Sequence, residues 1–156
     1  MEDGLEGGCA CGAVRYRLGT APMFVHCCHC RDCQHQTGSA FVINALIETD
    51  RIAALGATPG PVPVPTESGL PHRIFRCPTC QTAVWSEYGG RAALRFVRVG
   101  TLDQPASLSP DVHIYVRSKL PWVQLPEGVP AFDAYYEATK LWPAASLERR
   151  LAALRR

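Results

Sequence analysis

Two short cysteine motifs that lie far apart in the chain are the first residues with recognisable chemistry. Cys9 and Cys11 form a CxC motif flanked by glycines, and Cys77 and Cys80 form a CxxC motif with proline after its first cysteine. On an extended chain, residues two positions apart point to the same side, and glycine lets the backbone turn closely around an ion. Four thiolates complete the tetrahedral shell of zinc, at Zn–S distances of about 2.3 Å. We therefore expect Cys9, Cys11, Cys77 and Cys80 to hold one structural zinc ion, in a closed site with no place for a substrate.

A second group of cysteines lies in residues 26–33, whose sequence is HCCHCRDC. If residues 24–30 are extended, Cys28 and Cys30 share one face, and Cys33 follows around the next turn. Three thiolates leave the fourth position of a zinc ion open, which is the pattern of catalytic zinc. We expect Cys28, Cys30 and Cys33 to be catalytic residues that hold a second zinc ion.

The residues around this group leave alternatives open. Cys27, His29 or His113 could supply a fourth ligand, which would make the second site another closed one. The group could also hold no metal and form a patch of reactive thiols. By itself, Cys27 is expected to be a core cysteine or a support for the ligands, and His26 and His29 to be hydrogen-bonded framework residues. His113 lies within an expected strand, where it is either a proton shuttle or a hydrogen-bonded core imidazole.

The composition is that of a globular chain, with 156 residues of which 47% are hydrophobic and 19% charged. This length fits a single domain over residues 1–156. The net charge of +2, without a dense basic stripe, argues against a nucleic-acid partner. No apolar run approaches the roughly 20 residues that cross a bilayer, and the acidic start lacks the layout of a secretory signal. We expect a cytoplasmic protein whose eight cysteines bind metal instead of forming disulfides.

Short segments separated by glycine and proline predict a mainly β fold. The expected strands are residues 14–18, 24–28, 41–47, 73–77, 84–88, 94–99 and 112–116. Residues 56–65 (GATPGPVPVP) cannot form a central strand, because proline lacks the N–H donor and has a fixed φ. We expect this segment to be a surface loop or an extended edge.

Helical features are confined to residues 131–156, which we expect to be a helical C-terminal extension. Residues 132–140 are expected to form a short helix, and Pro143 suits the first turn of another. One apolar stripe runs along this second helix. It consists of Leu147, Leu151 and Leu154. The stripe either docks on the sheet or makes an oligomer contact.

Taken in order, these motifs resemble those of the glutathione-dependent formaldehyde-activating enzyme family, which includes the centromere protein V group. The matching segments span nearly the whole chain. They are residues 8–16 (GCACGAVRY), 28–33 (CHCRDC), 37–38 (TG), 75–80 (FRCPTC), 99–103 (VGTLD), 113–116 (HIYV) and 120–122 (LPW). The ordered set of CxC, CxCxxC and CxxC is highly specific, although each motif alone would be weak.

The resemblance implies an Mss4-like fold of twisted antiparallel β-sheets, with one structural zinc and one zinc at the active site. Carried over by motif, Cys9, Cys11, Cys77 and Cys80 hold the structural ion, and Cys28, Cys30 and Cys33 hold the second. The family's activity joins glutathione to formaldehyde, giving S-hydroxymethylglutathione, and is classed as a carbon–sulfur lyase activity. The family usually has glycine after the CxxC motif, where this chain has Gln81. We expect a positive φ or a slightly different turn there, at a cost of roughly 1 kcal/mol.

The function that follows is the addition of glutathione or a similar small thiol to formaldehyde or another small aldehyde. Coordination would deprotonate the substrate thiol and hold it beside the aldehyde. Arg31, Arg73 and Lys119 could pair with the carboxylates of glutathione, or be ordinary surface cations. Two alternatives stay open, namely an enzyme for a different thiol and a zinc-stabilised binding module of the same fold without turnover. No membrane partner is expected.

Overall fold

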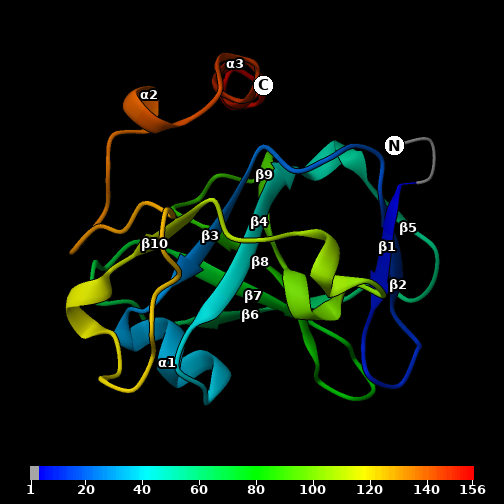
Figure 1. Ribbon diagram of the computed structural model, residues 1–156. Helices are drawn as coiled ribbons and strands as arrows, with labels where there is room; N and C mark the ends of the chain where they lie inside the picture. Colours follow the sequence, from blue (N-terminus) through cyan, green and yellow to red (C-terminus); the bar gives the residue numbers. More distant parts are fainter. Residues whose placement is uncertain (1–3) are drawn as a thin grey trace.

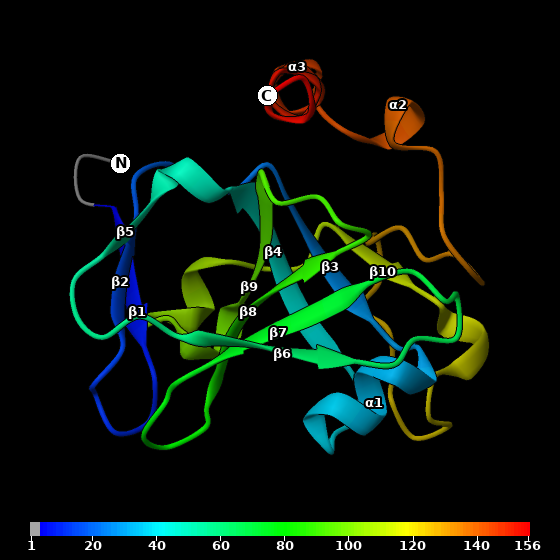
Figure 2. The ribbon, with the colours of Figure 1, turned by 180° about the vertical axis from the view of Figure 1, so that it is seen from behind.

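Two β-sheets form the body of the protein in the computed structural model, which describes residues 4–156 (Figures 1 and 2). The smaller sheet has the order β1-β2-β5, and the larger has the order β10-β3-β4-β9-β8-β7-β6. The strands are β1 (Leu5–Gly8), β2 (Arg15–Leu18), β3 (Phe24–Cys28), β4 (Val42–Glu48), β5 (Ile52–Ala54), β6 (Gly60–Val64), β7 (His72–Arg76), β8 (Ala83–Tyr88), β9 (Leu94–Arg98) and β10 (Val112–Ile114). The α-helices are α1 (Arg31–Thr37), α2 (Ala138–Leu141) and α3 (Ala144–Leu154), and single 3-10 turns occupy Thr49–Arg51, Val99–Thr101, Pro105–Ser107 and Val116–Ser118. The prediction of a mainly β fold with a short helical tail is confirmed.

The larger sheet is antiparallel except at one edge. There β10 pairs with β3 in parallel, with His113 opposite Cys27. The expected antiparallel sheet is thus mixed at this one edge, where the long segment between the two strands gives the chain room to cross over. The strand expected over residues 112–116 also ends early, because Tyr115 adopts a left-handed conformation with φ 55°.

The proline-rich segment lies at the opposite edge of the larger sheet. Pro61 and Pro63 belong to β6, which pairs only with β7 among the described strands. Proline is tolerated on an edge strand because its missing N–H would face away from the sheet. This confirms the prediction of an extended edge within residues 56–65.

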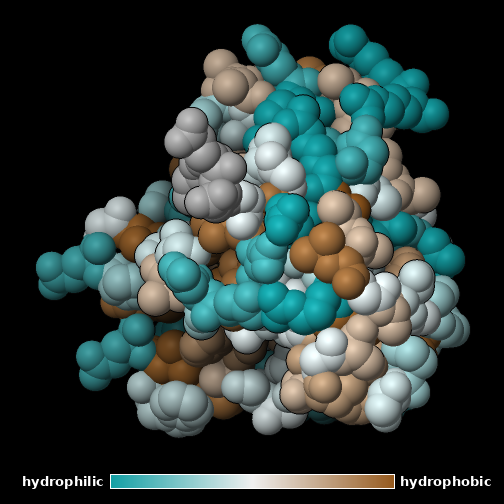
Figure 3. Space-filling model, turned by 90° about the vertical axis from the view of Figure 1, so that its right-hand side faces the viewer, coloured by the Kyte–Doolittle hydropathy of each residue, from teal (hydrophilic) through white to brown (hydrophobic). Residues whose placement is uncertain are grey.

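The smaller sheet covers part of the larger one with its apolar face. Tyr16 is fully buried against Trp85, with ring centroids 5.5 Å apart in an edge-to-face arrangement. The Tyr16 hydroxyl also lies 2.6 Å from Thr101 Oγ1, which satisfies its polar atom inside the core. The outer face carries ion pairs such as Arg15 with Asp103, 2.8 Å apart, and many hydrophilic side chains lie on this side of the molecule (Figure 3).

The C-terminal helices pack at the end of β3 and β4 that lies away from α1 (Figure 1). Trp142 stacks on Phe24 with ring centroids 5.0 Å apart, and Ser146 Oγ donates to the Met23 carbonyl at 2.7 Å. Within residues 4–156, no helix combines the length and the apolar composition needed to cross a membrane.

The helix predicted over residues 132–140 is mostly wrong, since only Ala138–Leu141 is helical at its end. The backbone of Phe132 is engaged elsewhere, because its N–H donates to the His113 carbonyl at 3.0 Å and its carbonyl accepts from Val116. Hydrogen bonds to His113 in β10 and to Val116 just after it keep the backbone around Phe132 extended. Such a long-range partner cannot be read from local sequence.

The leucine stripe of α3 is not the face that docks on the sheet. Leu151 and Leu154 are 51% and 42% exposed, whereas Ala153 is buried. Only Leu147 of the stripe packs against the core. The rotation of the helix follows the polar anchors at Ser146 and Arg149, so the docking prediction is wrong for two of the three leucines. The oligomer contact stays a prediction.

Arg149 fastens α3 to the buried carboxylate of Glu48. Its Nε and Nη2 atoms donate to the two carboxylate oxygens at 2.9 and 2.7 Å. Burial by itself would raise the pKa of Glu48, but the hydrogen bonds and charge of Arg149 outweigh it and lower the pKa. Arg51 supplies a second cation, 3.2 Å away.

We expect Arg149→Gln to lower the free energy of unfolding by about 2 kcal/mol at pH 7, because it leaves a buried carboxylate short of a partner. The pKa of Glu48 is lower in the folded state than in the unfolded state. Its stabilising contribution is therefore present at neutral pH and is lost as the pH falls through and below about 4.3. Urea unfolding at pH 7 and pH 4 should show the gap between variant and wild type narrowing in acid. Arg155→Gln, at an exposed site without an ion pair among the described residues, is the control. A gap that does not change with pH would contradict this account.

Candidate metal centres

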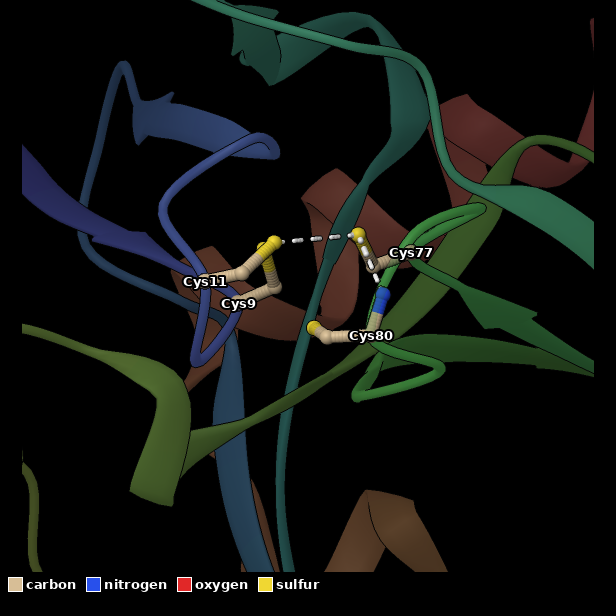
Figure 4. Close-up of side chains that lie close together, drawn as sticks. All are labelled: Cys9, Cys11, Cys77 and Cys80. Atoms are coloured by element: carbon tan, nitrogen blue, oxygen red, sulfur yellow. Dashed lines mark hydrogen bonds between the residues drawn. The ribbon is translucent and has the colours of Figure 1, made fainter.

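The CxC and CxxC motifs come together as one cluster of four sulfur atoms. Cys9 and Cys11 lie in the loop after β1, and Cys77 and Cys80 lie in the loop between β7 and β8 (Figure 4). All four Sγ atoms lie within 4.8 Å of one another, with 3.5 Å between Cys9 and Cys11 and 3.8 Å between Cys11 and Cys77. A tetrahedron with Zn–S distances of about 2.3 Å has S–S edges of about 3.8 Å. The cluster therefore has the dimensions of a closed four-thiolate zinc site.

Backbone N–H groups point at these sulfur atoms. Val14 N donates to Cys9 Sγ at 3.2 Å, and Thr79 N donates to Cys77 Sγ at 3.4 Å. The Thr82 hydroxyl, 3.1 Å from Cys80 Sγ, lowers the pKa of Cys80 to about 5. Donors of this kind favour the thiolate form, which is the form that binds metal. The chemistry of the donor set thus fits zinc.

Gln81 completes the turn of the CxxC loop in a left-handed conformation, with φ 63°. Its N–H donates to the Cys77 carbonyl at 3.0 Å, which closes the turn below the sulfur atoms. The expectation of a positive φ at this position is confirmed.

We expect Gln81→Gly to raise the free energy of unfolding by about 1 kcal/mol, because glycine adopts positive φ without a steric penalty. Thermal or urea unfolding of the metal-loaded protein measures the change. Gln104→Gly is the matched control, because Gln104 has φ −124° and gains nothing from glycine there. A Gln81→Gly variant less stable than wild type would show that this φ carries no strain.

The second cluster is built by the end of β3 and the start of α1. Cys28 is the last residue of β3, Cys30 is the N-cap of α1, and Cys33 lies in its first turns. Their three sulfur atoms lie within 4.8 Å of one another. The Cys33 N–H donates to Cys30 Sγ at 3.3 Å. Hydrogen bonding with Cys28 and Cys33 lowers the pKa of Cys30, which favours its thiolate form.

Cys27, His29 and His113 form a cluster of their own, with Cys27 in β3, His29 just after this strand and His113 in the neighbouring β10. His29 Nε2 is 2.9 Å from His113 Nδ1 and 3.6 Å from Cys27 Sγ. Burial lowers the pKa of His29 to about 4 and also lowers that of His113, so both rings are neutral near pH 7. Among the described residues, no His, Cys, Asp or Glu joins the three-sulfur cluster as a fourth ligand. The closed alternative for that site is thus not supported, and His113 fits the core imidazole better than the proton shuttle.

His26 also has a framework role. Its Nε2 lies 2.6 Å from the Tyr136 hydroxyl, and this hydroxyl also accepts a hydrogen bond from Trp142 Nε1 at 2.7 Å. This chain of contacts ties the C-terminal segment to the strand that carries Cys28. The prediction that His26 is a hydrogen-bonded framework residue is confirmed.

The cations considered as partners for glutathione are largely engaged. Arg73 pairs with the buried Glu87 at 2.8 Å, and Lys119 Nζ donates to the Val123 carbonyl at 2.7 Å. Arg31 bonds to side chains of its own helix.

Two arginines that are not among the expected site residues line a cavity beside the three-sulfur cluster. They are Arg76 and Arg98. A sequence signal for Arg98 existed, because the alternation of Leu94, Phe96 and Arg98 places this arginine on the inward face of β9. The helix α1, which brings Cys33 back to Cys28, also went unpredicted.

The fold and these clusters define a mainly β, cysteine-rich protein with one four-sulfur and one three-sulfur centre. Residues 4–118 match the model of the glutathione-dependent formaldehyde-activating enzyme family, and the chain belongs to this family. A Halomonas elongata protein named "Putative glutathione-dependent formaldehyde-activating enzyme" is 28% identical over 126 residues, which cover 78% of this chain and 80% of that protein. A crystal structure of a Rhodobacter sphaeroides protein aligns with a TM-score of 0.48 and 18% identity, over 67% of this chain and 91% of that one.

Proposed function

We propose that this protein is a zinc-dependent enzyme of the carbon–sulfur lyase type, which joins glutathione or a similar small thiol to formaldehyde. The observation that carries the proposal is the three-sulfur cluster of Cys28, Cys30 and Cys33, which has no fourth protein ligand among residues 4–156. Membership of the family supports the choice of glutathione and formaldehyde.

In this proposal, Cys28, Cys30 and Cys33 hold the catalytic zinc, which when bound acidifies a substrate thiol and keeps it as a nucleophilic thiolate. The protein's part is to present three sulfur atoms in a fixed arrangement. The end of β3 and the first turns of α1 position them, and the Cys33 N–H stabilises the charge on Cys30. Cys28 is buried in the apolar cluster with Phe24 and Ile114, which restricts water on that side. Holding the thiol beside the aldehyde then lowers the entropic barrier.

The four-sulfur cluster has a different part in the proposal. Cys9, Cys11, Cys77 and Cys80 hold a structural zinc ion that links the loop after β1 to the loop between β7 and β8. With four protein ligands, this site would take no substrate. Its contribution is to stability alone.

The experiment that tests the function combines metal content with exchange kinetics. Elemental analysis of the purified protein should give two zinc ions per chain, of which mild chelation removes one. NMR exchange spectroscopy should show faster interconversion of glutathione and S-hydroxymethylglutathione with the loaded protein than with the chelated one. A preference for another thiol in the same assay would identify a different substrate. One tightly held zinc and no acceleration for any thiol would instead identify a binding module without turnover.

A further inference from the structure

A cavity of about 420 Å³ lies between α1 and the CxxC loop. Its lining includes Gln36 and Thr37 from the end of α1, Thr82 from the CxxC loop, and two arginines from neighbouring parts of the large sheet. The arginines are Arg76 at the end of β7 and Arg98 at the end of β9. The cavity therefore concentrates positive charge between the two cysteine clusters.

Arg98 is the unusual member of this lining, because it is only 7% exposed. Among the described residues, its side chain donates to the neutral Asn44 Oδ1 and forms no ion pair, and its buried Nε has no partner. Arg76 likewise donates to a neutral group, the Gln81 carbonyl, at 2.9 Å. Buried arginines are ordinarily paired with an acid. Here the buried Arg98 and the half-buried Arg76 lie in one cavity with no carboxylate among its lining residues, so the cavity has the charge of an anion site.

The cavity adjoins the three-sulfur cluster. Thr37 belongs to its lining, and the Thr37 hydroxyl donates to the Cys33 carbonyl at 2.8 Å. Val42, also in the lining, lies directly opposite Cys28 in the pairing of β3 with β4. Arg98 is on the strand beyond, so it is about 10 Å from β3 by strand spacing. An extended tripeptide spans about 10 Å, so one ligand could reach from Arg98 to the three-sulfur cluster.

The cavity also offers an unpartnered acceptor. The buried Gln36 Oε1 has no hydrogen-bond partner, while Gln36 Nε2 lies 3.2 Å from His72 Nδ1. A peptide ligand carries N–H groups, which could donate to Gln36 Oε1, and carboxylates, which could accept from the two arginines of the cavity.

We propose that Arg76 and Arg98 bind a carboxylate of a peptide thiol whose sulfur is directed at Cys28, Cys30 and Cys33. The inference rests on the proposed function for the identity of the thiol. It assigns to Arg76 and Arg98 the selection of thiols that carry a carboxylate over neutral thiols. Guanidinium groups suit this role because they present paired N–H donors to carboxylate oxygens.

The test uses S-methylglutathione, which has no free thiol, and its dimethyl ester, which has no carboxylates. Calorimetric titration of the wild-type protein should show binding of the acid and at least about tenfold weaker binding of the ester. Arg76→Gln and Arg98→Gln should each weaken binding of the acid by about tenfold or more and leave binding of the ester unchanged. Arg155→Gln, at an exposed site on the end of α3, is the control and should bind both ligands as the wild type does.

The outcomes separate this proposal from others. Equal binding of acid and ester by the wild type, or unchanged binding of the acid by both arginine variants, overturns it. Arg98 could instead balance the charge of the nearby thiolates, in which case Arg98→Gln would lower the zinc content while Arg76→Gln would bind the acid normally, and this result also overturns it. Arginine-dependent binding of the acid in a protein that turns over no thiol supports the carboxylate site and removes the enzymatic function. If both variants still turn over 2-mercaptoethanol while their turnover of glutathione falls, the result supports the carboxylate site and the enzymatic function together.

Discussion

Replacing Cys30 by serine is expected to reduce thiol–formaldehyde exchange by about 1,000-fold or more while the fold is retained. A bound metal ion contributes several kcal/mol to a reaction of this kind, and each 1.36 kcal/mol is a factor of ten in rate. With one of three ligands removed, the remaining two sulfur atoms should no longer hold the ion.

The fold should survive because serine can take over the local structural role of Cys30. This residue is the N-cap of α1, and its sulfur accepts the Cys33 N–H at 3.3 Å. Serine is among the preferred N-cap residues, because its hydroxyl oxygen accepts the same kind of hydrogen bond. Loss of activity in this variant would therefore report on the metal centre and not on unfolding.

Three measurements check this prediction, namely exchange rate, zinc content and far-UV circular dichroism. Zinc should fall from two ions per chain to one, with the spectrum unchanged. Cys27→Ser is the matched control, since Cys27 is the immediate neighbour of Cys28 but the alternation of side chains along β3 places it on the other face. It should keep both ions and its activity. A Cys30→Ser variant that matches wild type with every thiol would end the catalytic assignment.

Replacing Cys9 by serine has the second large expected effect, which is loss of the folded state. Structural zinc in small sites contributes about 10–16 kcal/mol of apparent binding free energy, as much as the whole net stability of a typical domain of about 5–15 kcal/mol. The four-sulfur cluster joins the loop after β1 to the loop between β7 and β8. Without it, these loops have mainly weaker contacts such as that of Ala10 N with Thr82 Oγ1, at 3.3 Å.

Circular dichroism, thermal unfolding and elemental analysis of Cys9→Ser test this expectation. The variant should show no cooperative transition, and excess zinc should not restore one. Cys27→Ala controls for the removal of a buried sulfur atom outside both clusters, with an expected cost of about 1–2 kcal/mol. A Cys9→Ser protein that unfolds cooperatively near the wild-type temperature with two bound ions would refute the assignment of the structural site.

The chain by itself determined the features that depend on local chemistry. The spacing of Cys9 with Cys11 and of Cys77 with Cys80 predicts ligand pairs, since residues two or three apart are held close by the backbone alone. Alternation predicted most strands of the larger sheet within one or two residues of their observed ends. The positive φ of Gln81 was expected because the family that the motifs resemble usually has glycine at this position.

Only the tertiary structure decided the features that depend on distant partners. The pairing of Phe132 with His113 prevents a helix that its own segment would allow, and the bond from Arg149 to Glu48 turns two leucines of α3 outward. Folding likewise placed His113 with His29, away from Cys28. It also brought Arg76 and Arg98 into one cavity. Long-range contacts of this kind are set by the packing of the whole chain, and no local pattern encodes them.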